Sequence, residues 1–317
     1  MKKSILLCSL FCAIVLFTSC NNDDDVNPII IDFGTAPSSS ILTTGTVDVI
    51  TENTIRYHFL TLGGLSSTIV ESETGIVVID LGAPFFVPNT GEELRTYSNT
   101  IGKPISVIIT HDHVDHYANI NKFIDVPVYA ETNSAAALMG DSGFTDVYTN
   151  TITAVSSTQI IQGIEFTFDN VSNAETGENG YVYITETKAL FTGDLVFNQA
   201  HNYLREYTPL DATDELNNWI DGLNSLKSNY GNYNHIFAGH GGKRTDVSTV
   251  IDENIAYLTD AQGLIKGTKN LTSGGIATTN QEVVDELTLL YSNYATGALN
   301  LSLPGAFFPG DLGATWF

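Results

Sequence analysis

Cysteine is almost absent from this chain of 317 residues, which contains only three. All three, Cys8, Cys12 and Cys20, lie within the first twenty residues. A domain that begins after this segment has neither a disulfide nor a thiolate ligand for a metal ion. Any metal site in such a domain must therefore use histidine and carboxylate side chains.

Basic residues are also scarce, with 13 Lys and Arg against 36 Asp and Glu and a formal net charge of −23. A field of this sign repels phosphate groups, and no basic stripe interrupts it, so we expect no nucleic-acid partner. Hydrophobic residues make up 43% of the chain. At this length they suffice for the core of one large domain or two small ones.

The first nineteen residues have the pattern of a secretory signal peptide. Two lysines precede an apolar run over 5–17 that is too short to span a membrane easily. The ending Leu16–Cys20 resembles a bacterial lipobox, whose cysteine is lipid-modified, although Phe17 stands where leucine is usual. A signal peptide that is cleaved elsewhere is the alternative. The acidic run 23–25 resembles the tether of lipoproteins displayed on an outer membrane.

These features predict an exported protein with a signal peptide at 1–19 and a lipid on Cys20. The lipid would anchor it to the outer membrane, facing the periplasm or the cell surface. Residues 20–40 are polar, with prolines and three consecutive serines, and we expect them to form a flexible spacer.

From residue 41 onward, strand patterns occur in runs and each half is followed by helices. This order predicts the α/β class, with two mixed β-sheets packed face to face and helices on both outer faces, an αββα four-layer sandwich. We expect one domain over 41–317, with a helical and irregular extension at about 267–317. The predicted strands are 54–60, 67–72, 76–80, 105–110, 127–130, 159–161, 164–168, 181–184, 189–192 and 235–238, and the predicted helices are 92–101, 117–124, 132–139, 214–230, 247–266 and 280–294.

The densest chemical signal is the run His111-Asp112-His113-Val114-Asp115-His116. It follows the apolar, β-branched strand predicted at 105–110 and precedes helical spacing, so its side chains can converge in one strand-to-helix loop. Neutral imidazoles and carboxylates are ligands of zinc and similar divalent ions. The chain has seven histidines, and three of them lie in these six residues. The run therefore predicts a metal site.

One loop cannot complete a coordination shell, so other strand ends must supply further donors. Glu175 stands just before a predicted strand, and Asp194 and His240 each stand just after one. Glycines flank Asp194 and His240 and permit tight backbone turns close to an ion. Each residue alone is weak evidence, since such positions often hold turn formers or surface histidines. Together with the loop they form a set of candidate metal ligands.

These motifs resemble those of the metallo-β-lactamase superfamily over about residues 41–266. His111, His113, Asp115 and His116 match its His-x-His-x-Asp-His loop, and Thr192-Gly193-Asp194 and Gly239-His240-Gly241 resemble two later motifs. The resemblance implies two divalent metal ions, one on His111, His113 and Glu175 and one on Asp115, His116 and His240, with Asp194 between them. It also implies that Asp80, at the end of an early strand, supports the loop from behind.

Glu175 departs from the family pattern, which usually has histidine there. An incomplete first site, with Glu175 merely lining the pocket, is the alternative. Some alkylsulfatase-like members of the family also use glutamate in the metal site. A carboxylate in place of an imidazole favours harder ions such as manganese or iron. Zinc is nevertheless the first expectation.

The resemblance implies a dinuclear metal-dependent hydrolase in which metal-bound hydroxide attacks an ester, a lactone or a similar small-molecule bond. Asp115 would orient the nucleophile and carry its proton. His201 and Tyr203 are candidate substrate-binding residues, and a structural role in a loop is the alternative for His201. A β-lactamase is a second hypothesis. A surface binding lipoprotein with a vestigial metal site is a third.

Overall fold

The computed structural model describes residues 33, 38–62, 64–84, 87–204 and 212–295. The predicted signal peptide, Cys20, most of the predicted spacer and the end of the chain from residue 296 lie outside this range. Within it, α1 (Ser38–Ile41) begins inside the predicted spacer. None of the described helices combines the length and the apolar character needed to cross a membrane.

The first half of the chain builds one half-sheet. The antiparallel strands β1 (Thr46–Glu52), β2 (Ile55–Leu62) and β3 (Leu65–Glu71) lead into β4 (Ile76–Ile79), and β4 pairs in parallel with β5 (Ile105–Ile108), followed by β6 (Val128–Glu131) and β7 (Thr153–Val155). Every residue of β4 and β5 is buried, as the unbroken apolar runs of covered parallel strands require. The intervening helices are α2 (Thr90–Ile101), α3 (Val114–Tyr117), α4 (Thr132–Gly140) and α5 (Ser142–Thr145), with the 3₁₀ turn η1 (Ile120–Lys122).

The second half builds another half-sheet. A tight hairpin at 162–163 joins β8 (Thr158–Ile161) to β9 (Ile164–Ser172), and β10 (Glu178–Ile184) and β11 (Ala189–Phe197) continue the antiparallel order. Helix α6 (Ala212–Tyr230) then crosses over to β12 (His235–His240), which is parallel to β11 and carries the short β13 (Lys243–Arg244). Helices α7 (Val247–Ile265) and α8 (Asn280–Leu290) follow.

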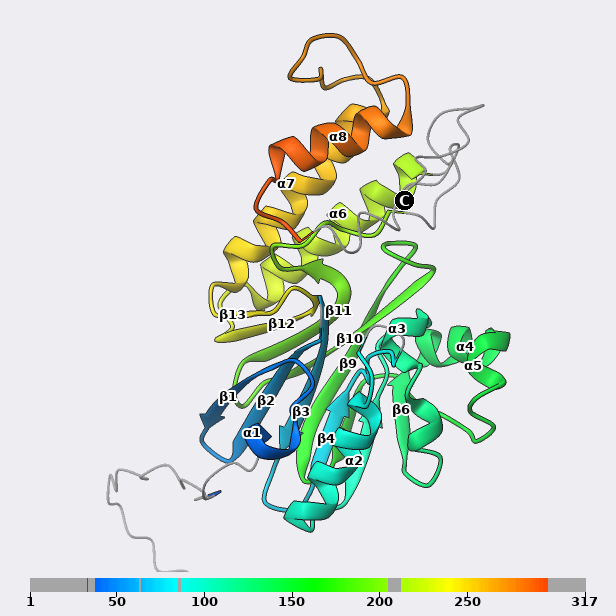
Figure 1. Cartoon of the computed structure of the whole chain (residues 1–317), viewed down its shortest axis with the longest axis vertical. Coiled ribbons are helices and arrows are strands. Elements are labelled where there is room, and N and C mark those ends of the chain that lie inside the picture. Colours follow the sequence, from blue (N-terminus) through cyan, green and yellow to red (C-terminus); the bar gives the residue numbers. More distant parts are fainter. Residues whose placement is uncertain (1–32, 34–37, 63, 85–86, 205–211, 296–317) are drawn as a thin grey trace, which may run out of the picture.

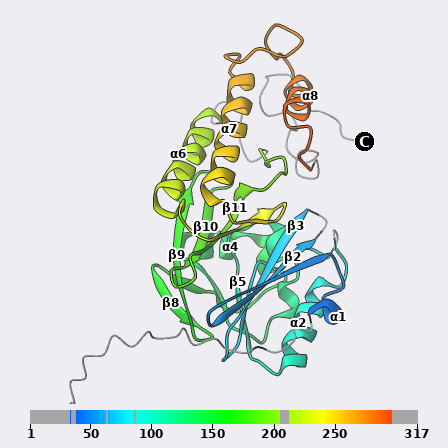
Figure 2. The ribbon, with the colours of Figure 1, turned by 90° about the vertical axis from the view of Figure 1, so that its left-hand side faces the viewer.

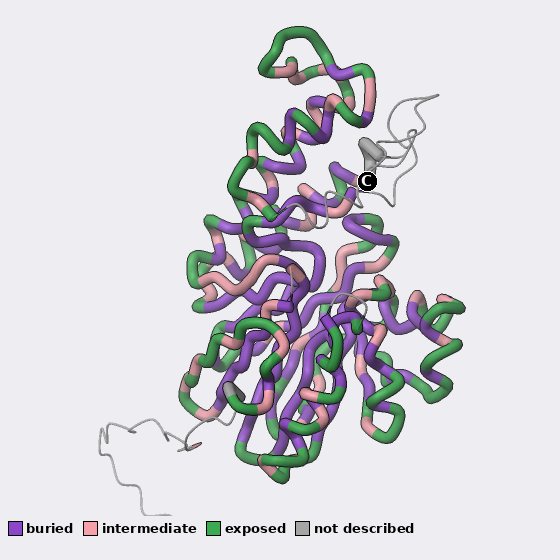
Figure 3. Tube along the Cα trace, viewed as in Figure 1, coloured by how far each residue is buried: buried purple, intermediate pink, exposed green. Residues whose placement is uncertain are grey.

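Four layers result, as predicted, with helices on both outer faces of the paired half-sheets (Figures 1 and 2). One core lies between the first half-sheet and its helices, a second between the two half-sheets, and a third between β10–β12 and helices α6 and α7. Buried residues accordingly follow the strands, while exposed residues follow the outer helices and loops (Figure 3). The half-sheets share one register pair among the described strands, Leu65 with His240.

Two predicted helices differ from the structure. No α-helix covers 118–124: α3 ends at Tyr117 and only the 3₁₀ turn η1 follows. Between them the Asn119 side chain donates to the carbonyls of Leu81 and Gly82, which lie far from it in the sequence. The helix expected at 280–294 ends at Leu290. Its continuation turns back toward the body, where the N–H of Ala295 donates to the carbonyl of Gln199.

Candidate metal centre

The loop predicted to bind metal lies between β5 and α3, at the edge where the parallel strands of the first half-sheet end. His113 is the residue before α3, and Asp115 and His116 lie in the first turn of that helix. His111 and His116 are buried. The side chains of His113 and Asp115 retain 18% and 19% exposure, so the centre opens to solvent on their side.

Asp80 supports the loop from behind, as the resemblance implied. It follows β4 with a left-handed φ of 54°, and its carboxylate accepts from the N–H and the hydroxyl of Thr110, both at 2.9 Å. The same carboxylate accepts from Nδ1 of His116 at 2.8 Å. Because the Thr110 hydroxyl donates to Asp80, it must accept from Nδ1 of His111, 2.9 Å away. Both imidazoles therefore present Nε2 to the centre, the orientation that metal-binding histidines need.

The second half-sheet contributes the remaining donors. Glu175 lies in the turn between β9 and β10 and is completely buried. Asn179 shapes this turn, accepting from the N–H of Thr176 and donating to its carbonyl. His240 is the last residue of β12. The sequence predicted that Asp194 follows its strand, but the structure places it within β11. It lies just after an irregularity at Gly193, which has a φ of 50°.

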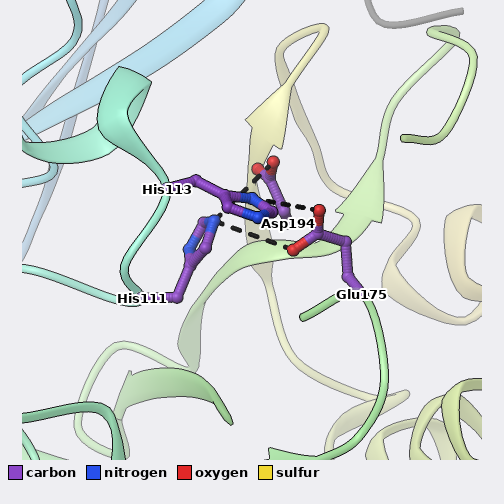
Figure 4. Close-up of side chains that lie close together, drawn as sticks. All are labelled: His111, His113, Glu175 and Asp194. Atoms are coloured by element: carbon purple, nitrogen blue, oxygen red, sulfur yellow. Dashed lines mark ion pairs between the residues drawn. The ribbon is translucent and has the colours of Figure 1, made fainter. Parts of the chain in front are cut away.

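The seven predicted ligands come together in two groups that share Asp194. The first group is His111, His113, Glu175 and Asp194 (Figure 4), and the second is Asp115, His116, Asp194 and His240. In each group one ligand atom per residue lies within 4.8 Å of the others.

Short distances link the members of each group. In the first, Glu175 Oε1 is 3.2 Å from His113 Nδ1, and Glu175 Oε2 is 3.7 Å from His111 Nε2. In the second, Asp194 Oδ1 is 3.1 Å from His116 Nε2, and Asp194 Oδ2 is 3.1 Å from His240 Nε2. Asp194 therefore faces both groups.

Several of these donor atoms are buried without a hydrogen bond. They are Nε2 of His111, Nε2 of His116, both carboxylate oxygens of Glu175 and Oδ1 of Asp194. Buried polar atoms normally have partners, and buried carboxylates without one are costly. A cation held between facing lone pairs resolves this, so the residues present fit a pair of divalent ions.

Burial and neighbouring charges shift the pKa values of the candidate ligands. Burial raises the pKa of Glu175 to about 7. Burial also lowers the pKa of His111 well below its usual range, with His116 and His113 adding to the effect. Burial opposes the charge on Asp194, but the imidazoles of His240 and His116 outweigh it and hold the Asp194 pKa well below normal. The carboxyl group of Glu175 therefore keeps its proton to a higher pH than usual, whereas His111 and Asp194 lose theirs at a lower pH than usual.

The packing leaves no space for side chains at two glycines beside Asp194. A Cβ on Gly239 would lie 2.0 Å from Asp194 Oδ1, and one on Gly193 would lie 2.7 Å from the hydroxyl of Thr110. Both distances are below any normal van der Waals contact. The glycines flanking Asp194 and His240 therefore serve close packing of the centre, besides the freedom of turn that the sequence suggested.

The two candidate substrate-binding residues have different surroundings. The ring of Tyr203 lies edge-on to the imidazole of His113, with centroids 5.4 Å apart. His201 is completely buried, and its Nδ1 is 3.1 Å from the hydroxyl of Tyr257 on α7. The structure therefore places Tyr203 beside the centre and gives His201 the surroundings of a structural loop residue.

Sequence reasoning missed two features of the centre. The ring of Phe197 stacks on the imidazole of His240, with centroids 4.8 Å apart and planes at 7°. A pocket of about 420 Å³ adjoins His113. Its lining residues are Asp112, His113, Val114, Tyr117, Ala137, Gly140, Asp141 and Thr176. Asp112 and His113 are the two potential metal ligands of the loop motif that line this pocket.

Comparisons with known proteins agree with this architecture. The family model of the metallo-beta-lactamase superfamily matches residues 60–231. The chain belongs to this superfamily, whose members are mostly hydrolases and typically bind divalent metals. No curated protein is significantly similar to it in sequence.

Similar solved structures include enzymes of more than one type. The metallo-beta-lactamase from Pontibacter korlensis is 21% identical, with a TM-score of 0.51, and the match covers 68% of this chain and 99% of that one. VMB-1 is 17% identical, with a TM-score of 0.54 and coverage of 69% and 99%. A double mutant of the sec-alkyl sulfatase PisA1 is 18% identical, with a TM-score of 0.51 and coverage of 84% and 48%. At these identities the likenesses show the fold alone.

Proposed function

We propose that this protein is a dinuclear metal-dependent hydrolase of a small-molecule ester, lactone or sulfate ester. One observation carries the proposal: seven side chains form two groups around a shared Asp194, and five of their buried donor atoms have no hydrogen bond. His111, His113 and Glu175 would hold one ion, and Asp115, His116 and His240 the other. Zinc is the first expectation, although the extra carboxylate shifts the preference of the site toward harder ions such as manganese or iron.

Two bound divalent ions would supply a water of lowered pKa and polarise the bond to be broken. Asp115 is suited to orient that water. Burial raises its pKa, but the imidazoles of His116 and His240 outweigh this effect and hold the pKa below its usual value. Asp115 therefore stays ionised, and its partial exposure lets it accept a hydrogen bond from a water on the open side and orient that water.

The pocket beside His113 supports a small-molecule substrate. Its volume of about 420 Å³ falls within the range of about 300–1,000 Å³ typical of such sites. Hydroxyl groups of Tyr117 and Thr176 line it together with two carboxylates, so polar parts of a substrate would find partners there. The ring of Tyr203 lies edge-on to His113 and would contact the substrate as well.

We propose esters, lactones and sulfate esters together because the donor set differs from the family's usual one. Replacing one imidazole by Glu175 leaves four imidazoles and three carboxylates, a more anionic set than the family's usual one. The sulfatase neighbour aligns with a larger share of this chain than the β-lactamases do. β-Lactam hydrolysis is therefore tested beside esters, lactones and sulfate esters.

Metal content and hydrolysis test the proposal together. The purified domain, reconstituted with zinc or manganese and dialysed, should hold two ions per chain by inductively coupled plasma mass spectrometry. Asp194→Asn should lose metal from both groups, because both share this carboxylate. Asp48→Asn, the same change at an exposed position of β1, serves as the control. Folded wild-type protein with fewer than one ion per chain would overturn the proposal.

The loaded domain is then assayed on nitrocefin, lactones, thioesters, carboxylic esters and alkyl sulfates. Turnover of a member of the ester class that disappears in Asp194→Asn and persists in Asp48→Asn is the expected result. Turnover confined to nitrocefin would replace the proposed substrate class by β-lactams. Full metal occupancy with no turnover of any substrate would support a binding protein instead.

A further inference from the structure

Residues Phe197–Tyr203 connect the two groups of the metal centre. We call this segment the strap. At its first residue the Phe197 ring stacks on His240, a member of the second group, with planes at 7°. At its last residue the Tyr203 ring lies edge-on to His113, a member of the first group. A single short segment therefore contacts one histidine of each group through an aromatic side chain.

Helix α7 holds the start of the strap. The buried Asn254 accepts from the N–H of Phe197 at 2.9 Å and donates to its carbonyl at 2.8 Å. It therefore pairs with the Phe197 backbone as a neighbouring strand would. Asn254 also accepts from the side chain of Asn202, further along the strap, at 3.2 Å. Two points of the strap are thus fixed to one residue of α7.

The end of the described chain holds the middle of the strap. The N–H of His201 donates to the carbonyl of Ala295 at 3.0 Å, and the N–H of Ala295 donates to the carbonyl of Gln199 at 2.8 Å. The imidazole of His201 lies edge-on against the stacked rings of Tyr257 and Tyr294 and is hydrogen-bonded to the Tyr257 hydroxyl. The buried His201 is therefore an anchor of the strap.

We propose that the strap positions the outer histidines of the metal centre and that α7 and residue 295 set its position. Phe197 fixes the ring plane of His240, and the anchored His201 keeps Tyr203 against His113. Phe197, His201, Asn254 and Tyr257 are then positioning residues that act through other side chains. The inference rests on the proposed function, because it presupposes that His113 and His240 bind metal. It assigns to the C-terminal helices a part in shaping the centre.

A pair of matched substitutions on β11 tests the Phe197 contact. Phe197→Leu removes the ring that stacks on His240, while Phe191→Leu removes a ring of the same strand that stacks on Phe237. Both lose similar buried surface, so both should lower thermal stability. Only Phe197→Leu should weaken one of two cobalt sites, by roughly 10- to 100-fold as for other residues that orient a ligand. It should also change the visible absorption spectrum of the bound cobalt.

A second pair tests the anchor. Tyr257→Phe removes the hydroxyl bonded to His201, and Tyr291→Phe removes a hydroxyl of the same aromatic cluster that bonds instead to Asp260. Transfer of cobalt to a chelator is followed by stopped flow. Tyr257→Phe should speed the release of one ion by roughly fivefold, the equivalent of one hydrogen bond. Tyr291→Phe should release both ions at the wild-type rate.

The outcomes separate the two proposals. Wild-type protein that binds no cobalt overturns the proposed function. Wild-type protein that binds two ions, with Phe197→Leu indistinguishable from Phe191→Leu in affinity and spectrum, overturns the strap alone. Equal release rates in Tyr257→Phe and Tyr291→Phe count against the anchor in the same way.

Discussion

Glu175 gives the sharpest test of the centre, because metal-free and metal-loaded protein should respond to its replacement in opposite directions. Its carboxylate is completely buried, and neither oxygen has a hydrogen bond. Burial raises its pKa from 4.5 to about 7, a destabilisation of the ionised form on the order of 3 kcal/mol. Glu175→Gln keeps the shape and removes the charge. The metal-free variant should therefore be more stable than the wild type at pH 8, by up to that amount.

The pH dependence follows from the direction of this shift. A carboxyl group with a raised pKa in the folded state makes folding less favourable as pH rises from 4.5 to about 7. The advantage of Glu175→Gln should thus be absent at pH 4.5 and complete above pH 7. Urea unfolding of chelator-treated proteins at both ends of this range measures it. Glu165→Gln, the same change at an exposed position of β9, should show no such advantage.

Metal should reverse the order. Ions that bind only the folded state stabilise it in proportion to their affinity, and the variant lacks a donor to the first group. With zinc or manganese present, Glu175→Gln should retain about one ion and melt below the wild type. If metal-free Glu175→Gln is less stable than the metal-free wild type at pH 8, burial of the ionised Glu175 carboxylate does not destabilise the protein. If metal content is unchanged, Glu175 is not a ligand.

Three further predictions concern the scaffold. Glu71→Gln should destabilise the protein at pH 7 by about 3 kcal/mol because it breaks a buried ion-pair network. Burial raises the pKa of Glu71, but its hydrogen-bonded partners outweigh burial and lower the pKa to about 2. Urea unfolding should therefore show the stability difference between variant and wild type fading as pH falls from 4.5 to 2. Gly239→Ala should lose metal by mass spectrometry, since its Cβ collides with Asp194. Asp80→Asn, which tolerates the same left-handed backbone, should weaken metal binding in calorimetry by roughly 10- to 100-fold, because Asp80 orients His116.

Each of these predictions has a control or a contrary outcome. Gly140→Ala, at the end of α4, should leave metal content unchanged, because the new Cβ has no atom within 4 Å beyond its chain neighbours and its own helix backbone. A stability loss in Glu71→Gln that persists undiminished to pH 2 would show that packing, and not the charge of Glu71, maintains the network. Wild-type affinity in Asp80→Asn would mean that the tautomer of His116 is fixed in another way.

The sequence was most informative where a short motif carries the function. The six residues from His111 to His116 lie together because one loop contains them, and alternating strands and helices place Asp194 and His240 at the same edge. The four layers followed from the same order of strands and helices. The supporting role of Asp80 was predicted from the resemblance to the family.

Contacts between distant segments could not be predicted in this way. Phe197 looked like an ordinary core residue, and only the pairing of β11 with β12 places its ring on His240. Asn254 gave no signal, because its role depends on the position of α7 against β11. The early end of α8 depends on Ala295 meeting Gln199 from almost one hundred residues away. Local patterns contain no information on such pairings.

The single register pair between Leu65 and His240 has a consequence for the mechanics of the chain. Each donor group takes members from both half-sheets, so an ion in either group would join segments that backbone pairing barely connects. An ion in the second group would tie residue 116 to residue 240 and close a loop of about 124 residues, and a covalent tie of that length restricts the unfolded chain by about 5 kcal/mol. In a domain without cysteines, metal would take the place of a disulfide. Chelation should then loosen the seam between the halves and expose it to proteases before either half unfolds.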